Sequence, residues 1–68
     1  MKMTISELLV RIGLSHSMSE GRRAIVMGGV QINDEIKDDL AEEVDIQKGD
    51  KLKLGKRIVV EITERHLA

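Results

Sequence analysis

The sequence predicts an α+β fold in which two N-terminal helices pack on a small, mainly antiparallel sheet of three to five short strands. Two observations support this prediction. Apolar residues recur every three or four positions up to about residue 27, and from Val30 onward they alternate with polar residues. Glycines and polar pairs separate the alternating runs, as in tight turns. We expect residues 1–68 to form one domain with a core over about residues 4–62.

The first helix is expected over residues 5–13. Thr4 and Glu7 have the spacing of a capping box, in which the threonine oxygen accepts a hydrogen bond from the glutamate N–H. Gly13 can end the helix in a left-handed conformation, and Leu14 can then fold back onto its last turn. The apolar face consists of Ile5, Leu8, Leu9 and Ile12.

A second helix of about ten residues is expected to follow. Ser17 and Glu20 form another capping-box pattern, and Gly28 and Gly29 end the helix. At about 100° per residue, Gly21, Ala24, Ile25 and Gly28 share a small apolar face, opposite Ser19, Arg22, Arg23 and Val26. On these residues alone, the two arginines are either a phosphate-binding pair beside exposed helix N–H groups or solvated surface residues.

From Val30 the pattern predicts strands. A hairpin is expected with its turn at Asn33-Asp34 and its return strand at Ile36. Residues 34–47 are expected to be mostly loop, with a strand over 44–46 left open. Residues 48–50 form a turn before a strand over 51–54, in which Leu52 and Leu54 face inward.

A last turn over residues 55–57 leads into a strand over 58–62. Alternation predicts that Ile58, Val60 and Ile62 face the core. Residues 64–68 are expected to be a frayed tail or a short helical turn.

The formal net charge of −1 hides an uneven distribution of charges. Residues 34–47 carry seven acidic groups and one basic group, whereas residues 48–57 carry five basic groups and one acidic group. The chain has no cysteine and no Phe, Tyr or Trp, which excludes disulfides, thiolate metal sites and aromatic platforms for base stacking. No apolar run has the length of a membrane span. We therefore expect a soluble cytoplasmic protein without a membrane partner.

The residues do not form a pattern typical of an enzyme, and we expect no catalytic residue, no cofactor and no metal. His16 and His66 lie far apart, and an exposed loop position explains His16 better than a phosphate contact. The acidic segment lacks the spacing of a calcium-binding loop. A second basic cluster, Lys51, Lys53, Lys56 and Arg57, can contact a nucleic-acid backbone, or its outward lysines can protect an edge strand from aggregation.

Taken together, these motifs resemble the S-four domain, the small RNA-binding domain named after the fourth protein of the small ribosomal subunit. The resemblance runs from Ile5 to about Ile62. The matching residues are Leu8, Leu9, Gly13, Leu14, Ser17, Ser19, Glu20, Arg22, Arg23, Ile25, Gly28, Gly29, Val30 and Asn33, followed by Gly49-Asp50 and Gly55-Lys56. The SEGRR and GGVQIN segments are most similar to the C-terminal domain of bacterial-type tyrosyl-tRNA synthetases.

The resemblance implies a non-catalytic module that binds structured RNA by phosphate and shape contacts. The first candidate for the RNA partner is tRNA, and rRNA is the second. The isolated domain is expected to be a monomer. If the chain is excised from a larger enzyme, the parent is a tyrosine-tRNA ligase whose chemistry lies elsewhere. The residues expected to contact RNA are Ser17, Ser19, Arg22, Arg23, Gln31, Lys53, Lys56 and Arg57.

The sequence departs from the family pattern at several positions. Gly21 stands where alanine is usual, Asp34 replaces a common turn glycine, and Met18 and Val26 stand where relatives often carry Lys or Arg. Two basic contacts are therefore missing, and weak RNA binding is expected. Two alternatives stay open: a protein-interaction module with an apolar patch of Met18, Val26 and Met27, and a free-standing ribosome-associated member of the family.

Overall fold

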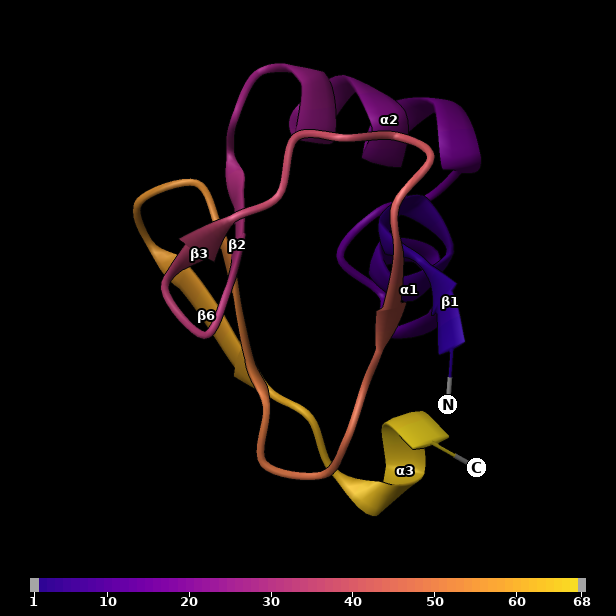
Figure 1. Ribbon diagram of the computed structural model, residues 1–68, viewed down its shortest axis with the longest axis vertical. Helices are drawn as coiled ribbons and strands as arrows, with labels where there is room; N and C mark the ends of the chain where they lie inside the picture. The colour runs from indigo at the N-terminus through magenta and orange to yellow at the C-terminus, as the bar shows by residue number, and fades with distance from the viewer. Residues whose placement is uncertain (1, 68) are drawn as a thin grey trace.

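Short helices and short strands follow one another along residues 2–67, the part of the chain that the computed structural model describes. In chain order they are β1 (Lys2–Thr4), α1 (Ile5–Arg11), α2 (Met18–Val26), β2 (Val30–Ile32), β3 (Glu35–Ile36), β4 (Glu43–Asp45), β5 (Lys51–Leu54), β6 (Ile58–Glu61) and α3 (Glu64–Leu67). The strands form two antiparallel sheets, a pair β1-β4 and a four-stranded sheet of order β3-β2-β5-β6 (Figure 1). The predicted α+β class is confirmed.

Both N-terminal helices begin at the predicted caps. Thr4 Oγ1 accepts a hydrogen bond from the Glu7 N–H over 3.4 Å, and Ser17 Oγ accepts one from the Glu20 N–H over 3.2 Å. The reciprocal bond of the second capping box, from the Ser17 N–H to the Glu20 carboxylate, does not form within residues 2–67. One side-chain bond is thus enough to fix each helix start.

Both helices end at a glycine with positive φ, 85° at Gly13 and 74° at Gly28. After α1, the Leu14 N–H donates to the Leu9 carbonyl over 2.9 Å, and after α2, the Gly29 N–H donates to the Ala24 carbonyl over 3.1 Å. These bonds are those of a Schellman motif, which satisfies carbonyls that the helix end leaves open. The predicted stops are confirmed, although α1 ends at Arg11 and not at residue 13.

The core is built from aliphatic side chains of both N-terminal helices, of both sheets and of the segments that follow β4 and β6. Ile25 on α2 and Leu8 and Leu9 on α1 are among its fully buried members. Gly21 is also buried, and it brings α2 close to the backbone of Ser6 on α1. The buried aliphatic residues are Met3, Ile5, Leu8, Leu9, Ile25, Val30, Ile32, Val44, Ile46, Leu52 and Ile62.

The β2–β3 hairpin turns at Asn33 and Asp34, as predicted. Both residues have positive φ, 50° and 69°, which is the geometry of the tight turns that suit the twist of a hairpin. The Asn33 side chain accepts a hydrogen bond from the Lys51 N–H over 3.0 Å and donates one to Asp50 over 3.2 Å. The turn is therefore tied to the beginning of β5.

Ile58 lies on the core side of the sheet as predicted, because it pairs with Leu54, but it is not buried. Its side chain is 44% exposed, while Val60 is half-buried and Ile62 is buried as expected. β6 is the outermost strand of its sheet, and Ile58 follows directly after the exposed turn over residues 55–57. Alternation gives the face of a strand but not how far the covering layer extends.

The two ends of the described chain differ from the sequence reading. β1 was not predicted, and it pairs with β4, which takes up the strand left open over residues 44–46. Residues 64–67 form α3, so the helical alternative holds for them, and Ala68 lies outside the described residues. Leu67 packs against the core, and the Arg11 side chain donates to the His66 carbonyl over 2.6 Å, so α3 is held against α1.

Candidate nucleic-acid interface

The exposed face of α2 carries Arg22 and Arg23. Residues three and four apart on a helix are neighbours, so Ser19 lies beside both arginines. Both guanidinium groups are exposed, and within residues 2–67 neither forms an ion pair. The Ser17 hydroxyl is exposed and caps the helix by accepting from the Glu20 N–H. The arginines are therefore available to an outside anion.

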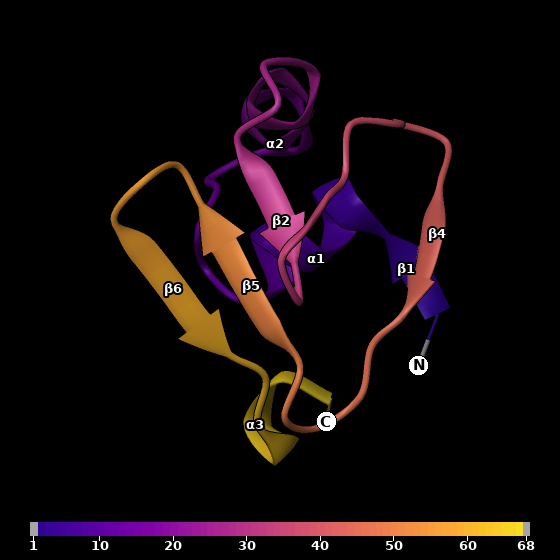
Figure 2. The ribbon, with the colours of Figure 1, turned by 60° about the vertical axis from the view of Figure 1, so that its left-hand side comes forward.

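A second basic group lies in the turn between β5 and β6. Gly55 begins this turn with φ of 67°, and Lys56 and Arg57 after it are exposed. The Gly55 N–H donates to the Gly29 carbonyl over 2.7 Å, which bonds the turn to the segment that leaves α2. Figure 2 shows α2 and this turn at the same upper end of the molecule.

Gln31 and Lys53 lie directly opposite each other in the β2–β5 ladder. Both side chains are half-buried, on the sheet face opposite to buried Val30 and Leu52. Each is two residues from the Gly29–Gly55 bond, about 7 Å along its strand. The structure thus places the predicted RNA-contacting residues along α2, in the β5–β6 turn and on the adjoining end of the sheet.

The acidic segment occupies another side of the molecule. A hollow of about 430 Å³ lies between β4 and the β2–β3 hairpin, and it is lined by carboxylates from β3, from β4 and from the residues just before β4 and β5. These are Glu35, Glu42, Glu43, Asp45 and Asp50. Within residues 2–67 no group of three or more acidic or histidine side chains has the arrangement of a metal site. The hollow is a region of negative charge that repels phosphate.

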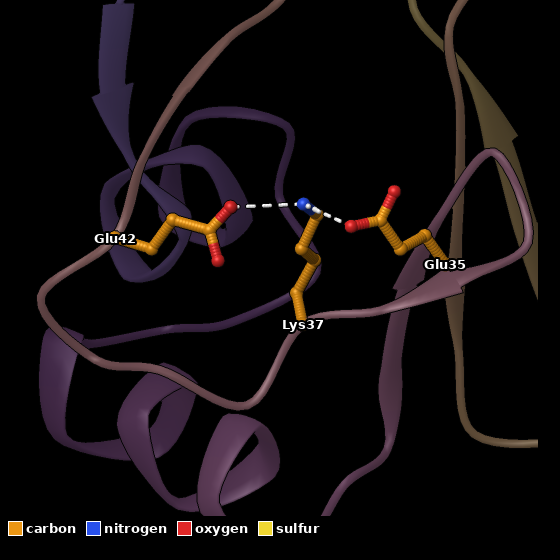
Figure 3. A network of polar contacts seen from close by, with 3 residues as sticks. All are labelled: Glu35, Lys37 and Glu42. Carbon is orange, nitrogen blue, oxygen red and sulfur yellow. Dashed lines mark hydrogen bonds and ion pairs between the residues drawn. The ribbon is translucent and has the colours of Figure 1, made fainter.

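Lys37 holds this acidic segment in place. Its Nζ contacts Glu42 Oε2 at 2.8 Å and Glu35 Oε1 at 3.1 Å, and its side chain is 13% exposed (Figure 3). The hydrogen bonds that Lys37 donates to Glu42 and, to a lesser extent, to Glu35 raise the pKa of Lys37 above its ordinary value of 10.5. The lysine joins β3 to the segment before β4, and it neutralises part of the charge of two carboxylates.

Two comparisons relate this chain to known proteins. The family model of the S4 domain matches residues 3–52. This chain belongs to the S4 domain family. It is also 44% identical to a tyrosine–tRNA ligase from Bartonella quintana, over 74% of this chain and 13% of the ligase. The chain therefore spans a small part of the length of that relative. The resemblance found in the sequence is confirmed, and the S4 domain is an RNA-binding domain.

The basic and acidic residues flank α2 on different sides. In Figure 2, α2 lies between the β5–β6 turn on one side and the segment joining β3 to β4 on the other. That segment carries exposed Asp38 and Asp39. An RNA backbone therefore meets less repulsion when it approaches α2 from the side of the β5–β6 turn.

Sequence reasoning missed the bond that connects the two basic groups. The Gly29 carbonyl and the Gly55 N–H continue the β2–β5 ladder past the strand ends, since Val30 pairs with Leu54. A signal was present in the two glycines, each one residue outside a strand that alternates cleanly.

No helix within residues 2–67 has the length and apolar character needed to cross a membrane.

Proposed function

We propose that this chain is a non-catalytic RNA-binding module that holds structured RNA through phosphate and shape contacts. The observation that carries the proposal is the Gly29–Gly55 bond, which keeps the arginine pair of α2 and the Lys56-Arg57 turn at one end of the domain. Two cationic groups in a fixed relation can contact phosphates on two segments of a folded RNA, and they read its shape more than its sequence.

Each predicted residue has a role in this proposal. Arg22 and Arg23 donate to phosphate oxygens, for which the planar guanidinium is suited. Lys56 and Arg57 contact a second stretch of backbone, and Gln31 and Lys53 extend the surface onto the sheet. Ser17 and Ser19 offer hydroxyl groups near the start of α2, where the helix dipole favours an anion.

The expected RNA is tRNA. The support is the 44% identity to a part of a protein named tyrosine–tRNA ligase. In this proposal the chain supplies RNA binding to a larger ligase whose chemistry lies outside these residues. In this proposal residues 1–68 act as one monomeric domain in the cytoplasm. A chain without cysteine fits that compartment, because cytoplasmic proteins are not stabilised by disulfides.

The test is a titration of fluorescent tyrosine-accepting tRNA with the chain at two or more salt concentrations. The double variant Arg22→Ala/Arg23→Ala should weaken binding by about ten-fold or more, because charged hydrogen bonds to phosphate contribute on this scale. It should also lower the slope of log affinity against log salt by about two, one for each lost phosphate contact.

The matched control is Lys48→Ala/Arg65→Ala, which removes the same charge at the other end of the molecule. Lys48 contacts Glu64 of α3 at 3.2 Å, and α3 lies opposite α2 (Figure 2). This control should bind like the unchanged chain. Absence of binding, or equal losses in both double variants, would contradict the proposal. Tighter binding to a ribosomal RNA helix than to tRNA would instead support the free-standing ribosomal alternative.

A further inference from the structure

Two large apolar side chains stand exposed at the end of the cationic face of α2. Val26 is 64% exposed, and Met27, which follows it at the C-cap, is 79% exposed. Val26 lies four residues after Arg22 and three after Arg23, and Met27 lies four residues after Arg23, so Val26 neighbours both arginines and Met27 neighbours one. Met18, the third member of the apolar patch suggested by the sequence, is half-buried.

The surroundings of this pair are cationic on two sides. Arg22 and Arg23 lie one turn before it, and Lys56 and Arg57 lie in the turn that is bonded to Gly29. The acidic residue of α2, Glu20, is in its first turn, about 9 Å along the axis from Val26. The segment with exposed Asp38 and Asp39 lies on the other side of α2, so an occupant that complements this surface combines an apolar face with negative charges directed toward the arginines and the β5–β6 turn.

We propose that Val26 and Met27 receive the face of an unpaired nucleotide in the bound RNA, while the arginines and the Lys56-Arg57 turn hold the phosphates around it. A nucleotide has the required chemistry, because its base is flat and apolar on its faces and its phosphates are anionic. Methionine is suited to this contact, since its polarizable sulfur packs favourably against aromatic rings.

A fully paired helix fits the surface less well. In A-form RNA the base faces are stacked inside, so the two apolar side chains would lie against ribose and phosphate. A bulge or loop can splay one base outward, and aliphatic burial then adds to the phosphate contacts. This surface therefore selects RNA with an unpaired nucleotide over a perfect duplex.

The experiment compares two labelled RNA hairpins of identical stem sequence, one fully paired and one with a single bulged adenosine. The unchanged chain should prefer the bulged hairpin by about ten-fold. The variant Val26→Thr/Met27→Gln, which keeps side-chain shape, should lose this preference and retain its affinity for the paired hairpin. Val10→Thr, which changes an exposed valine of α1, should keep the preference.

A second readout uses methyl NMR. The chain has no Phe, Tyr or Trp, and its two histidines, His16 before α2 and His66 in α3, are not at the C-terminal end of α2, so a ring-current shift of the Val26 or Met27 methyls on RNA addition is assigned to a nucleobase. The Met27 and Val26 methyl signals should shift with the bulged hairpin and not with the paired one. The methyl of buried Met3 is the internal reference.

Because this inference rests on the proposed RNA-binding function, Arg22→Ala/Arg23→Ala is measured in parallel. If the unchanged chain binds both hairpins equally and this binding still depends on the arginines, the inference about an unpaired nucleotide is wrong and the proposed RNA-binding function holds. Absence of arginine-dependent binding to either hairpin overturns both. If sedimentation shows a dimer that Val26→Thr/Met27→Gln converts to a monomer, a second copy of the chain is the occupant, and the inference is wrong.

Discussion

The carbonyl oxygen of Gly29 accepts a hydrogen bond of 2.7 Å from the backbone N–H of Gly55. The bond joins the segment that leaves α2 to the turn that carries Lys56 and Arg57, so a helix and a hairpin share one backbone contact. Since it continues the β2–β5 ladder, its position depends on the register of the whole sheet. The relative placement of the two cationic groups is therefore a property of the fold and not of flexible side chains alone.

Gly55→Ala should disturb this junction. Gly55 has φ of 67°, and an added Cβ would meet no atom within 4 Å, so the cost is backbone strain of about 1 kcal/mol and not a clash. Gly29→Ala is the matched control, because Gly29 has no positive φ and its Cβ would make ordinary contacts at 3.5 and 3.9 Å. Thermal unfolding followed by circular dichroism should rank Gly55→Ala clearly below Gly29→Ala in stability. Equal stabilities would show that the turn relaxes freely.

Gly21→Ala should stabilise the domain, by about 0.5–1 kcal/mol, because alanine favours a helix interior over glycine by this amount. The site has room for it. A Cβ at Gly21 would lie 3.5 Å from Ser15 Oγ and 3.5 Å from the Ser6 Cα and carbonyl oxygen, which are ordinary van der Waals distances. Gly21→Leu should have the opposite effect, since a larger side chain would force α1 and α2 apart. Chemical denaturation should show a higher unfolding free energy for Gly21→Ala than for the unchanged chain, and a lower one for Gly21→Leu.

A third stability prediction concerns the β2–β3 turn. Asp34 has φ of 69°, a conformation that glycine adopts without the penalty of a Cβ. Asp34→Gly should therefore raise the free energy of unfolding by about 0.5 kcal/mol. Asn33→Gly should lower it by about 1 kcal/mol, because the Asn33 side chain bonds to both Lys51 and Asp50. A loss of stability in Asp34→Gly would mean that the aspartate side chain has a role that its exposed position does not indicate.

The sequence predicted what depends on neighbouring residues. Ser17 as a cap, Gly28 as a helix end and Asn33-Asp34 as a turn each need only a few residues of context, and the structure has all three. β1 could not be predicted in the same way. Its three residues contain one buried position, Met3, and it exists because β4 lies beside it.

In the candidate site too, local features were predicted from the sequence and relations between distant residues were not. Arg22 and Arg23 could be assigned to the exposed face of α2 from helical periodicity. Their relation to Lys56 and Arg57 depends on the pairing of β2 with β5, which lies about twenty residues further along the chain. The two carboxylates around Lys37 are only two and five residues away, but Glu42 reaches the lysine because the loop bends back, and the sequence did not predict that bend. Long-range pairing leaves little trace in local composition.

Lys37 should make stability depend on pH in the alkaline range. Its pKa is higher in the folded chain than the ordinary 10.5, so the folded state favours the protonated lysine. The contribution of Lys37 is therefore fully present below its ordinary pKa and is lost as the pH rises through the higher folded pKa. For a side chain near the surface we expect about 0.5–1 kcal/mol.

The measurement compares the unchanged chain with Lys37→Met from pH 8 to pH 12. The difference in unfolding free energy should be constant near pH 8 and should disappear toward the upper end of the range. The chain has no tyrosine or cysteine to titrate in the same interval, and the other lysines are common to both proteins. A difference that persists unchanged at the highest pH would assign the stabilisation to packing of the lysine stem and not to its charge.

Val26→Lys should add a positive charge to the exposed face of α2. Val26 is 64% exposed and lies beside Arg22 and Arg23, so the new ammonium group would join the cationic face without filling the core. It stands in the last turn of α2, where the helix dipole favours a positive charge and offsets repulsion from the arginines. The slope of log affinity against log salt for paired RNA should become steeper by about one. The preference for a bulged hairpin should fall, because the apolar contact is lost.

Val10→Lys adds the same charge on α1 and should change the slope less. Equal slopes for both lysine variants would place the RNA away from the exposed face of α2.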